Sequence, residues 1–322
     1  MAHVTRRGLL AGAAALAVAP ARAQSGTMTL VVPFPPGGST DVLARMLQAP
    51  LQSRLNRVVI VENKTGASGS IGAAQVARSA PDGSSLLVTF DSIAVIPTIL
   101  EKPILDVEQD LVGVLLVGTA PYVIAANADL PYKTFADVVA AAKAKPGSVK
   151  YASVGIGTLG HLAMALLGNK TGADLLHVPY RGGGPAMNDV LGGHVDLIVG
   201  SAALIVPQLD SGKLRPIMQL GRERLSALKD TQTAVEAGFP DFETLAWWGI
   251  FAPKGTPADV TRKMAKEIRE IISEPAMAAK LRETQMMTLL LEEGDKFNAF
   301  FNKQLMVWGK VVRDNNIKAS GG

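Results

Sequence analysis

The stretch that decides the fold is KYASVGIGTLGHLAMALLG, residues 150–168. It begins like a short strand and ends like an apolar helix, and a glycine-rich turn joins the two parts. Within the turn, Gly155-Ile-Gly-Thr-Leu-Gly160 matches G-x-G-x-x-G, the pattern that holds the pyrophosphate of a dinucleotide at a helix N-terminus. The same kind of turn can hold a smaller anion, so the rest of the chain must decide between the two.

Short apolar runs alternate with helical patterns along the chain, which favours an α/β fold with largely parallel sheets. Besides the strand and helix of the opening stretch, we expect strands at residues 27–33, 58–62, 85–90, 112–118, 122–126, 175–178, 195–199, 214–220 and 245–252. We expect helices at residues 40–56, 70–79, 135–145, 185–191, after 256–257, and at 294–314. No long linker rich in Pro, Gly or Ser marks a domain boundary.

Residues 1–24 have the features of an export signal. Arg6 and Arg7 precede an apolar run over residues 8–19, and Ala21-Arg22-Ala23 has the A-x-A pattern of a cleavage site. The run is shorter than the roughly 20 residues that a membrane-spanning helix needs. We expect cleavage near Ala23, with an N-terminal anchor that stays attached as the alternative. The paired arginines partly resemble a twin-arginine signal, so the export route stays open between Sec and Tat.

The charge of the chain argues against nucleic acid as a partner. Of 32 basic residues, three lie in residues 1–24, which leaves 29 basic against 28 acidic residues in the exported part. A strongly basic footprint is therefore missing. The chain has no cysteine, which excludes thiol nucleophiles and thiolate metal sites, and the remaining 298 residues are long enough for two domains.

Three more glycine-rich loops accompany the opening one. Each follows an expected strand, and in open α/β sheets ligands bind at the carboxyl ends of the strands. Helix N-termini present unpaired N–H groups and favour anions, and glycine lets the backbone approach closely. Glycines also make simple tight turns, but four such loops together favour a cleft for a polar anion. The loops are residues 34–41, 63–72, 153–160 and 181–185.

The dinucleotide hypothesis lacks its expected acid. A dinucleotide site needs a carboxylate near the end of the next strand, about 20 residues after the turn, for the ribose. Here that strand runs into His177-Val-Pro-Tyr-Arg181, which contains no carboxylate, although Arg181 suits the 2′-phosphate of NADP. A dinucleotide-dependent or hydrolytic enzyme therefore stays only as the less favoured alternative, and we expect no cofactor.

Two residues of the loops allow two interpretations each. Asp41 either caps its own helix or orders the Gly37-Gly38 turn so that its amides point into the cleft, and the two roles are compatible. His161 is either a satisfied histidine in the first turn of a helix or a donor in the cleft. The histidines have no i,i+4 pairing and no cluster of other ligands, so we expect no metal site.

Six motifs in the same order resemble the Bug/TctC-type extracytoplasmic solute receptors of tripartite tricarboxylate transporters, over about residues 28–310. The resemblance implies a two-domain periplasmic-binding-protein fold, type II-like, in which each lobe is a mostly parallel sheet flanked by helices and the ligand cleft lies between the lobes. It implies lobe 1 at residues 25–122 and 244–322 and lobe 2 at 123–243. The motifs are TLVVPFPPGGSTDVLARML, VVIVENKTGASGSIGAAQVARSAPDGSSLLV, YASVGIGTLGHLA, HVPYRGGGPAMNDVLGGHVDL, SGKLRPI and WWGIFAPKGTPADV.

The resemblance also implies a function. A periplasmic receptor of this kind captures a small organic carboxylate and delivers it to the membrane subunits of a transporter, without catalysing a reaction. The alternative is a ligand-sensing input protein for a membrane sensor kinase. We expect a monomer. The residues that the resemblance places at the ligand are Phe34, Gly38, Ser39, Asp41, Ser92, Ser153, Gly157, Thr158, His161, Arg181 and Ser201.

The chain departs from the family pattern at three places, which leave the identity of the carboxylate open. After the third strand, Phe90-Asp91-Ser92 stands where many relatives have a small turn rich in Gly with Thr or Ser. An acid beside the cleft would repel a second carboxylate or attract an amine or hydroxyl of the ligand. Prolines common in relatives are missing at residues 224–233, and Gly200-Ser201-Ala202 replaces a turn that usually bears Asn or Asp.

Overall fold

The structure is a computed structural model that describes residues 26–315 and 317. The predicted export signal, residues 1–24, lies outside the described residues. The strands are β1 (Met28–Val32), β2 (Val59–Asn63), β3 (Ser85–Phe90), β4 (Leu111–Asn127), β5 (Val149–Ser153), β6 (Leu175–Pro179), β7 (Leu197–Ser201), β8 (Leu214–Gln219), β9 (Leu245–Pro253) and β10 (Thr288–Glu292). The helices are α1 (Ser39–Leu55), α2 (Ser70–Ala77), α3 (Ile96–Ile99), α4 (Phe135–Ala144), α5 (Leu159–Thr171), α6 (Gly183–Leu191), α7 (Ala202–Ile205), α8 (Ala258–Ser273), α9 (Pro275–Thr284) and α10 (Gly294–Asp314).

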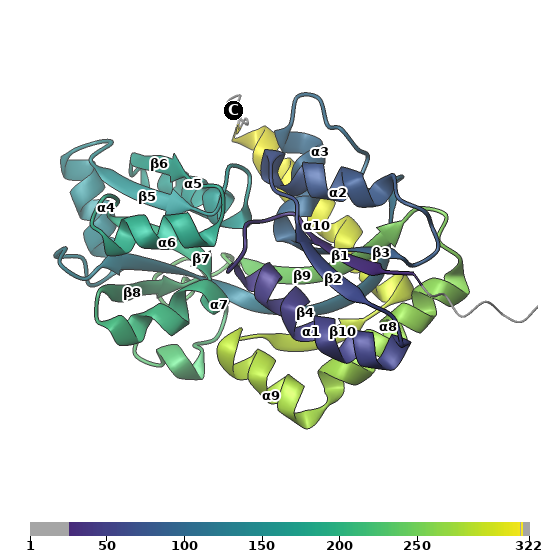
Figure 1. Cartoon of the computed structure of the whole chain (residues 1–322). Coiled ribbons are helices and arrows are strands. Elements are labelled where there is room, and N and C mark those ends of the chain that lie inside the picture. The colour runs from purple at the N-terminus through teal and green to yellow at the C-terminus, as the bar shows by residue number, and fades with distance from the viewer. Residues whose placement is uncertain (1–25, 316, 318–322) are drawn as a thin grey trace, which may run out of the picture.

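The strands form two groups, one in each of two lobes (Figure 1). In the first lobe, β2, β1 and β3 are parallel and β9 is antiparallel to β3. In the second lobe, β6, β5 and β7 are parallel. The predicted α/β fold with two lobes is confirmed, and each sheet is mixed because antiparallel strands extend its parallel core.

One long strand, β4, belongs to both groups. From Leu111 to Pro121 it pairs with β9, and from Tyr122 to Ala126 it pairs with β7. The sequence pattern predicted two separate runs here, at 112–118 and 122–126. Proline cannot donate to a strand ladder, and Pro121 lies where β4 leaves one partner and begins to pair with the next. The proline therefore interrupts the pattern without ending the strand.

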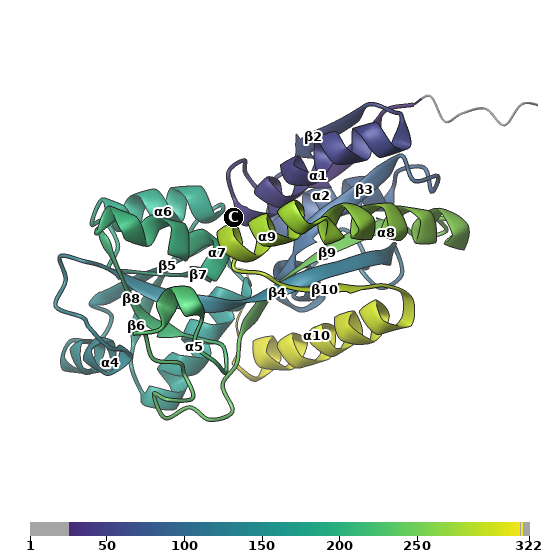
Figure 2. The ribbon, with the colours of Figure 1, turned by 90° about the horizontal axis from the view of Figure 1, so that it is seen from below.

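Each face of the first sheet is covered by helices. Leu30 and Val32 of β1 pack into the cluster that contains the apolar face of α1, while Val31 packs with α2 and α10. This is the two-residue alternation expected of a strand buried on both faces. Figure 2 shows α1 and α8 on one side of β4 and β9 and α10 on the other. The second sheet is covered in the same way, by α4 and α5 on one face and α6 and α7 on the other.

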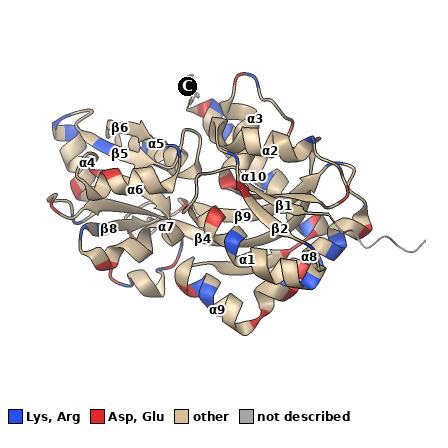
Figure 3. Cartoon of the chain, viewed as in Figure 1, with Lys and Arg blue, Asp and Glu red and all other residues tan. Residues whose placement is uncertain are grey.

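Charged residues of both signs are interspersed along outer helices such as α1, α8 and α9 (Figure 3). Several of them pair across elements, as Arg54 of α1 does with Glu267 of α8 at 2.7 Å. No helix of the described part of the chain is both long enough and apolar enough to cross a membrane.

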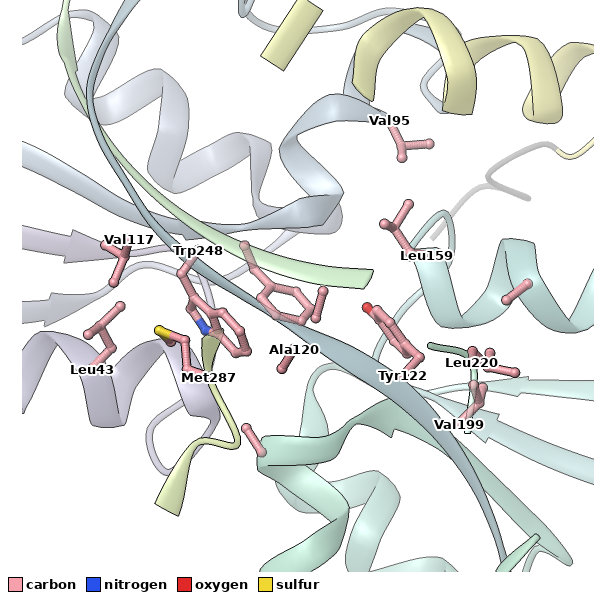
Figure 4. Packing of buried hydrophobic residues seen from close by; sticks show 14 of the residues in the cluster. Leu43, Val95, Val117, Ala120, Tyr122, Leu159, Val199, Leu220, Trp248 and Met287 are labelled. Atoms are coloured by element: carbon pink, nitrogen blue, oxygen red, sulfur yellow. The ribbon is translucent and has the colours of Figure 1, made fainter. Parts of the chain in front are cut away.

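The main apolar core continues from one lobe into the other along β4 (Figure 4). Trp248 and Met287 lie in the first lobe, and Tyr122 and Leu159 lie where the second lobe begins. Trp248 and Tyr122 are fully buried. The two lobes therefore share one continuous apolar core.

Two elements near the C-terminus were not predicted. Helix α9 begins at Pro275, directly after α8, and β10 pairs antiparallel with β4. Residues 288–291, Thr-Leu-Leu-Leu, form a short apolar run that fits a strand as well as a helix segment, and the periodicity did not assign it. In the structure β10 combines exposed and half-buried positions without a buried residue. Pro257 was predicted just inside a helix, and the structure places it at the N-cap of α8, one residue earlier. The expected bounds of β3 and α10 are confirmed.

Candidate functional site

The loop that follows β1 leads into the N-terminus of α1 and is held by Asp41. One carboxylate oxygen of Asp41 accepts hydrogen bonds from the N–H of Gly37 and from Arg45, both at 2.9 Å. The other accepts from the side chain of Asn63, also at 2.9 Å. Burial opposes the charge of Asp41, but these hydrogen bonds outweigh it and lower the pKa of the carboxyl group. Asp41 therefore orders the turn at Gly37 and compensates the charge of Arg45.

The loop that follows β6 faces this turn from the second lobe. Gly182 has φ +123° and ψ 176°, a conformation that only glycine adopts readily, and it precedes the first residue of α6. A Cβ atom on Gly182 would lie 2.9 Å from the Cδ atom of Pro35, which belongs to the first lobe. The N-termini of α1 and α6 thus approach each other across the gap between the lobes.

A small cavity of about 40 Å³ lies between the two loops. This volume is enough for a few water molecules, and the cavity is open toward solvent. The hydroxyl groups of Ser39, Thr40 and Ser201 make no hydrogen bond with any described residue, although Thr40 and Ser201 are each only 3% exposed. The lining residues are Phe34, Pro35, Gly38, Ser39, Thr40, Phe90, Val154, Gly182, Gly183, Ser201 and Leu204.

The cavity is therefore lined by hydrogen-bond donors that have no acceptor among the described residues. The first N–H groups of a helix have no partner within the helix and carry a partial positive charge. Helices α1 and α6 both begin at the cavity, and the unpaired hydroxyls add further donors. No Lys, Arg or His lines it among the residues that the structure describes. Such an arrangement suits one anion with several acceptor oxygens, such as a carboxylate.

The glycine-rich turn of the opening stretch lies elsewhere, in contact with the first lobe. Ser68 donates a hydrogen bond of 2.8 Å to the carbonyl oxygen of Ile156. A Cβ atom on Gly157, whose φ is +76°, would lie 2.8 Å from the side chain of Ile99. The turn is thus in direct contact with Ser68 and Ile99 of the first lobe.

The group that faces the N-terminus of α5 is the carboxyl group of Asp91. Asp91 is fully buried, and Tyr122 donates a hydrogen bond of 2.8 Å to one of its oxygens. Burial raises the pKa of Asp91 well above its usual range, while the hydroxyl of Tyr122 and the N–H of Leu159 act in the opposite direction. Burial and the neighbouring Asp91 also raise the pKa of Tyr122.

Asp91 does not line the cavity, so it does not act there as the acid that the sequence suggested beside the cleft. Its second oxygen is buried and forms no hydrogen bond of normal geometry with a described residue. Within the described chain, the N-terminus of α5 therefore meets a carboxyl group of the protein itself.

Two histidines form a stack behind this turn. The rings of His161 and His177 are 3.9 Å apart and nearly parallel, and Tyr151 stacks on the other side of His177. The Nδ1 atom of His161 accepts a hydrogen bond from the N–H of Gly157 at 3.1 Å, and Nε2 of His177 lies 2.7 Å from the hydroxyl of Ser153. Burial lowers the pKa of His161 to about 4, and burial with the neighbouring His161 lowers the pKa of His177 to about 3. Both rings are therefore neutral near pH 7.

The structure brings four of the predicted site residues to the cavity: Phe34, Gly38, Ser39 and Ser201. The other seven do not line it. Asp41 holds the Gly37 turn, Ser92 donates to the carbonyl of Ser68 at 3.3 Å, and Arg181 is exposed beside Gly182. Ser153, Gly157, Thr158 and His161 lie at the turn before α5, where Thr158 donates to the carbonyl oxygen of Gly155. Contact of any of these residues with a solute stays a prediction.

Seven lining residues were not predicted as site residues. Gly182 and Gly183 lie in a loop that the sequence pattern identified, and Pro35 and Thr40 lie next to predicted site residues. The sequence therefore predicted these segments but not these four residues as lining. Val154 also lies in a recognised loop, and Phe90 lies next to the turn of the predicted Ser92. Leu204, in α7, had no sequence signal, because an apolar residue there has the same pattern in a core and in a cavity wall. Among the described residues, no cluster of three His, Asp or Glu side chains could hold a metal ion.

Comparison with known proteins gives consistent matches over most of the chain. The profile of the family described as tripartite tricarboxylate transporter family receptor matches residues 43–317. Protein BugT of Bordetella pertussis is 34% identical over 295 residues, which cover 90% of this chain and 89% of BugT. The structure of the periplasmic binding protein BugD has a TM-score of 0.85 at 32% identity, covering 91% of this chain and 98% of BugD. The structure of R. palustris Rpa4515 with adipate has a TM-score of 0.86 at 28% identity, covering 90% of this chain and 97% of that chain.

Proposed function

Because the chain belongs to the tripartite tricarboxylate transporter receptor family, a family of periplasmic solute-binding receptors, we propose that it binds a small organic carboxylate between its lobes and delivers it to transporter subunits in the membrane. The observation that carries this proposal is the set of unpaired donors at the cavity. Thr40 from the first lobe and Ser201 from the second are buried, have no described hydrogen-bond partner and line the same small space. The adipate in Rpa4515 supports a carboxylate as the ligand.

The two lobes act together on the ligand. The N-terminus of α1 comes from the first lobe and that of α6 from the second, so all donors converge on one anion only when the lobes are close. Ligand binding then favours the closed state through contacts that the open state lacks. The proposed role of the protein is binding alone, since no step of covalent chemistry is needed for delivery.

The division into lobes is part of the proposal. We assign residues 25–122 and 244–322 to lobe 1 and residues 123–243 to lobe 2. The change of partners along β4, from β9 at Pro121 to β7 at Tyr122, lies one residue before the first boundary and supports it. β9 begins at Leu245, which supports the second. Export with cleavage near Ala23 and a monomeric state complete the proposal.

A thermal-shift screen tests the proposal directly. The purified protein is heated with and without each of a panel of carboxylates and their neutral amides at millimolar concentration. A ligand that binds only the folded state raises its stability by mass action, so at least one acid should raise the Tm and its amide should not. Mass spectrometry of the recovered acid should show it unchanged. No stabilisation by any acid of a broad panel, or conversion of an acid into a product, would overturn the proposal.

A further inference from the structure

Beyond its donors, the cavity has walls that are almost entirely apolar. Phe34 and Phe90 meet edge to face with ring centroids 6.4 Å apart. Phe90 continues onto Trp248, whose ring centroid is 5.3 Å away, so the wall is backed by the buried core. Val154 and Leu204 form the opposite side from the second lobe. A solute that enters here buries apolar surface against these side chains.

The charges near the cavity can meet one carboxylate and not two. No cationic side chain of the described chain lines it. Arg45, a cation in the first half of α1, is paired with Asp41 at 2.9 Å, and Arg181, beside Gly182, is exposed and outside the lining. The donors are uncharged: main-chain N–H groups at the start of α1 and α6, and the hydroxyls of Ser39, Thr40 and Ser201. A second carboxylate would lose its water against aromatic and aliphatic walls with no cation to compensate it, which is strongly unfavourable.

We propose that the ligand of this site is a monocarboxylic acid with an apolar body, aromatic or branched aliphatic. Its carboxylate lies at the N-termini of α1 and α6 with the hydroxyls of Thr40 and Ser201, and its body lies between Phe34 and Phe90 on one side and Leu204 on the other. This inference rests on the proposed function and narrows it, because dicarboxylates such as adipate are then poor ligands of this chain.

Isothermal titration calorimetry with benzoate, benzamide and adipate at pH 7 separates the inference from the function on which it rests. Benzoate should bind at least ten times more tightly than adipate, and benzamide, which has the same ring without the charge, should show no binding. If adipate binds more tightly than benzoate, the preference for a monocarboxylate is wrong, while the proposed function as a carboxylate receptor still holds. Equal binding of benzamide and benzoate, or no heat from either acid, would contradict the anion site itself.

A charge placed in the wall provides the second test. Leu204 is half-buried at the cavity, so the ammonium group in Leu204→Lys can meet a second carboxylate. Gln208→Lys adds the same charge four residues further along, outside the cavity, and is the matched control. Leu204→Lys should raise the affinity for adipate relative to benzoate at least tenfold, and Gln208→Lys should change this ratio less than twofold. An equal ratio in both variants would overturn the placement of the apolar body beside Leu204.

Discussion

Replacing Gly182 by Ala should weaken ligand binding by preventing full closure of the lobes. The new Cβ atom would lie 2.9 Å from the Cδ atom of Pro35, whereas unstrained carbon atoms stay about 3.5–4.0 Å apart. This contact exists only when the lobes are close, and overpacking of this kind costs about 1–3 kcal/mol. Affinity should therefore fall about 5- to 150-fold.

The same substitution also acts on both the open and the closed form. With φ +123° and ψ 176°, Gly182 has a conformation that costs other residues about 1–3 kcal/mol, so the free energy of unfolding should fall by a similar amount. Gly184→Ala is the control, because a Cβ atom on Gly184 would meet no other atom within 4 Å and the residue has no positive φ. It should leave the affinity unchanged and stabilise α6 slightly.

Closure can be measured without knowing the ligand in advance, because the chain has no cysteine. Cysteines introduced at the exposed positions Lys102 and Lys170 carry one spin label on each lobe, and pulsed electron paramagnetic resonance measures the distance between the labels. The acid with the largest thermal shift should shorten this distance in the parent protein and in Gly184→Ala, and shorten it less in Gly182→Ala. Removing the ring by Pro35→Ala in the Gly182→Ala background should restore part of the closure. Normal closure and affinity in Gly182→Ala, or no recovery with Pro35→Ala, would show that the contact between Gly182 and Pro35 does not limit closure.

Four further predictions concern hydroxyl groups and titratable groups. Ser201→Ala should weaken acid binding about tenfold to a hundredfold in calorimetry, since it removes one hydrogen bond to a charged group. Thr158→Ala, a matched deletion outside the cavity, should change affinity less than threefold, and an equal loss in both variants would instead favour the contact predicted from sequence. Asp91→Asn should make the Tm depend less on pH. The buried carboxyl group of Asp91 has a raised pKa in the folded protein, so its contribution to stability is full below pH 3.8, its pKa in the unfolded chain, and is lost as the pH rises. An unchanged slope of Tm against pH would show that Asp91 is not the titrating group. His177→Gln should make the protein less sensitive to acid. Folding lowers the pKa of His177 from 6.5 to about 3, so this residue costs the parent protein about 1–2 kcal/mol of its free energy of unfolding between pH 7 and pH 5. Denaturant unfolding at both pH values measures this loss, and an equal loss in the variant and the parent would contradict the prediction.

Most of the fold could be predicted because local patterns and the final environment agree. Residues 85–90, Ser-Leu-Leu-Val-Thr-Phe, are mostly apolar and favour a strand, and β3 is buried along its whole length. The break at Pro121 concealed the continuity of β4, since the strand survives there only because it exchanges one partner strand for another. That exchange is a property of the assembled sheet and leaves no trace in local sequence.

The site could be predicted as a set of loops but not as a cavity. Sequence placed Phe34, Ser39 and Ser201 at strand ends, and their meeting depends on how two lobes pack. Thr158 and His161 have equally suitable chemistry, yet within the second lobe Thr158 donates to the carbonyl oxygen of Gly155 and His161 stacks on His177. Asp91 of the first lobe meets the N–H of Leu159 at the start of α5. Which helix N-terminus stays free for a ligand is thus decided by long-range contacts.

The most direct test of the carboxylate site between the lobes is a crystal structure of the protein with the acid that gives the largest thermal shift. We expect one carboxylate within about 3 Å of the first N–H groups of α1 and of the hydroxyl of Ser201, in a closed cleft. A carboxylate bound at the N-terminus of α5, with Asp91 displaced, or bound outside the gap between the lobes would show that the site has been placed wrongly.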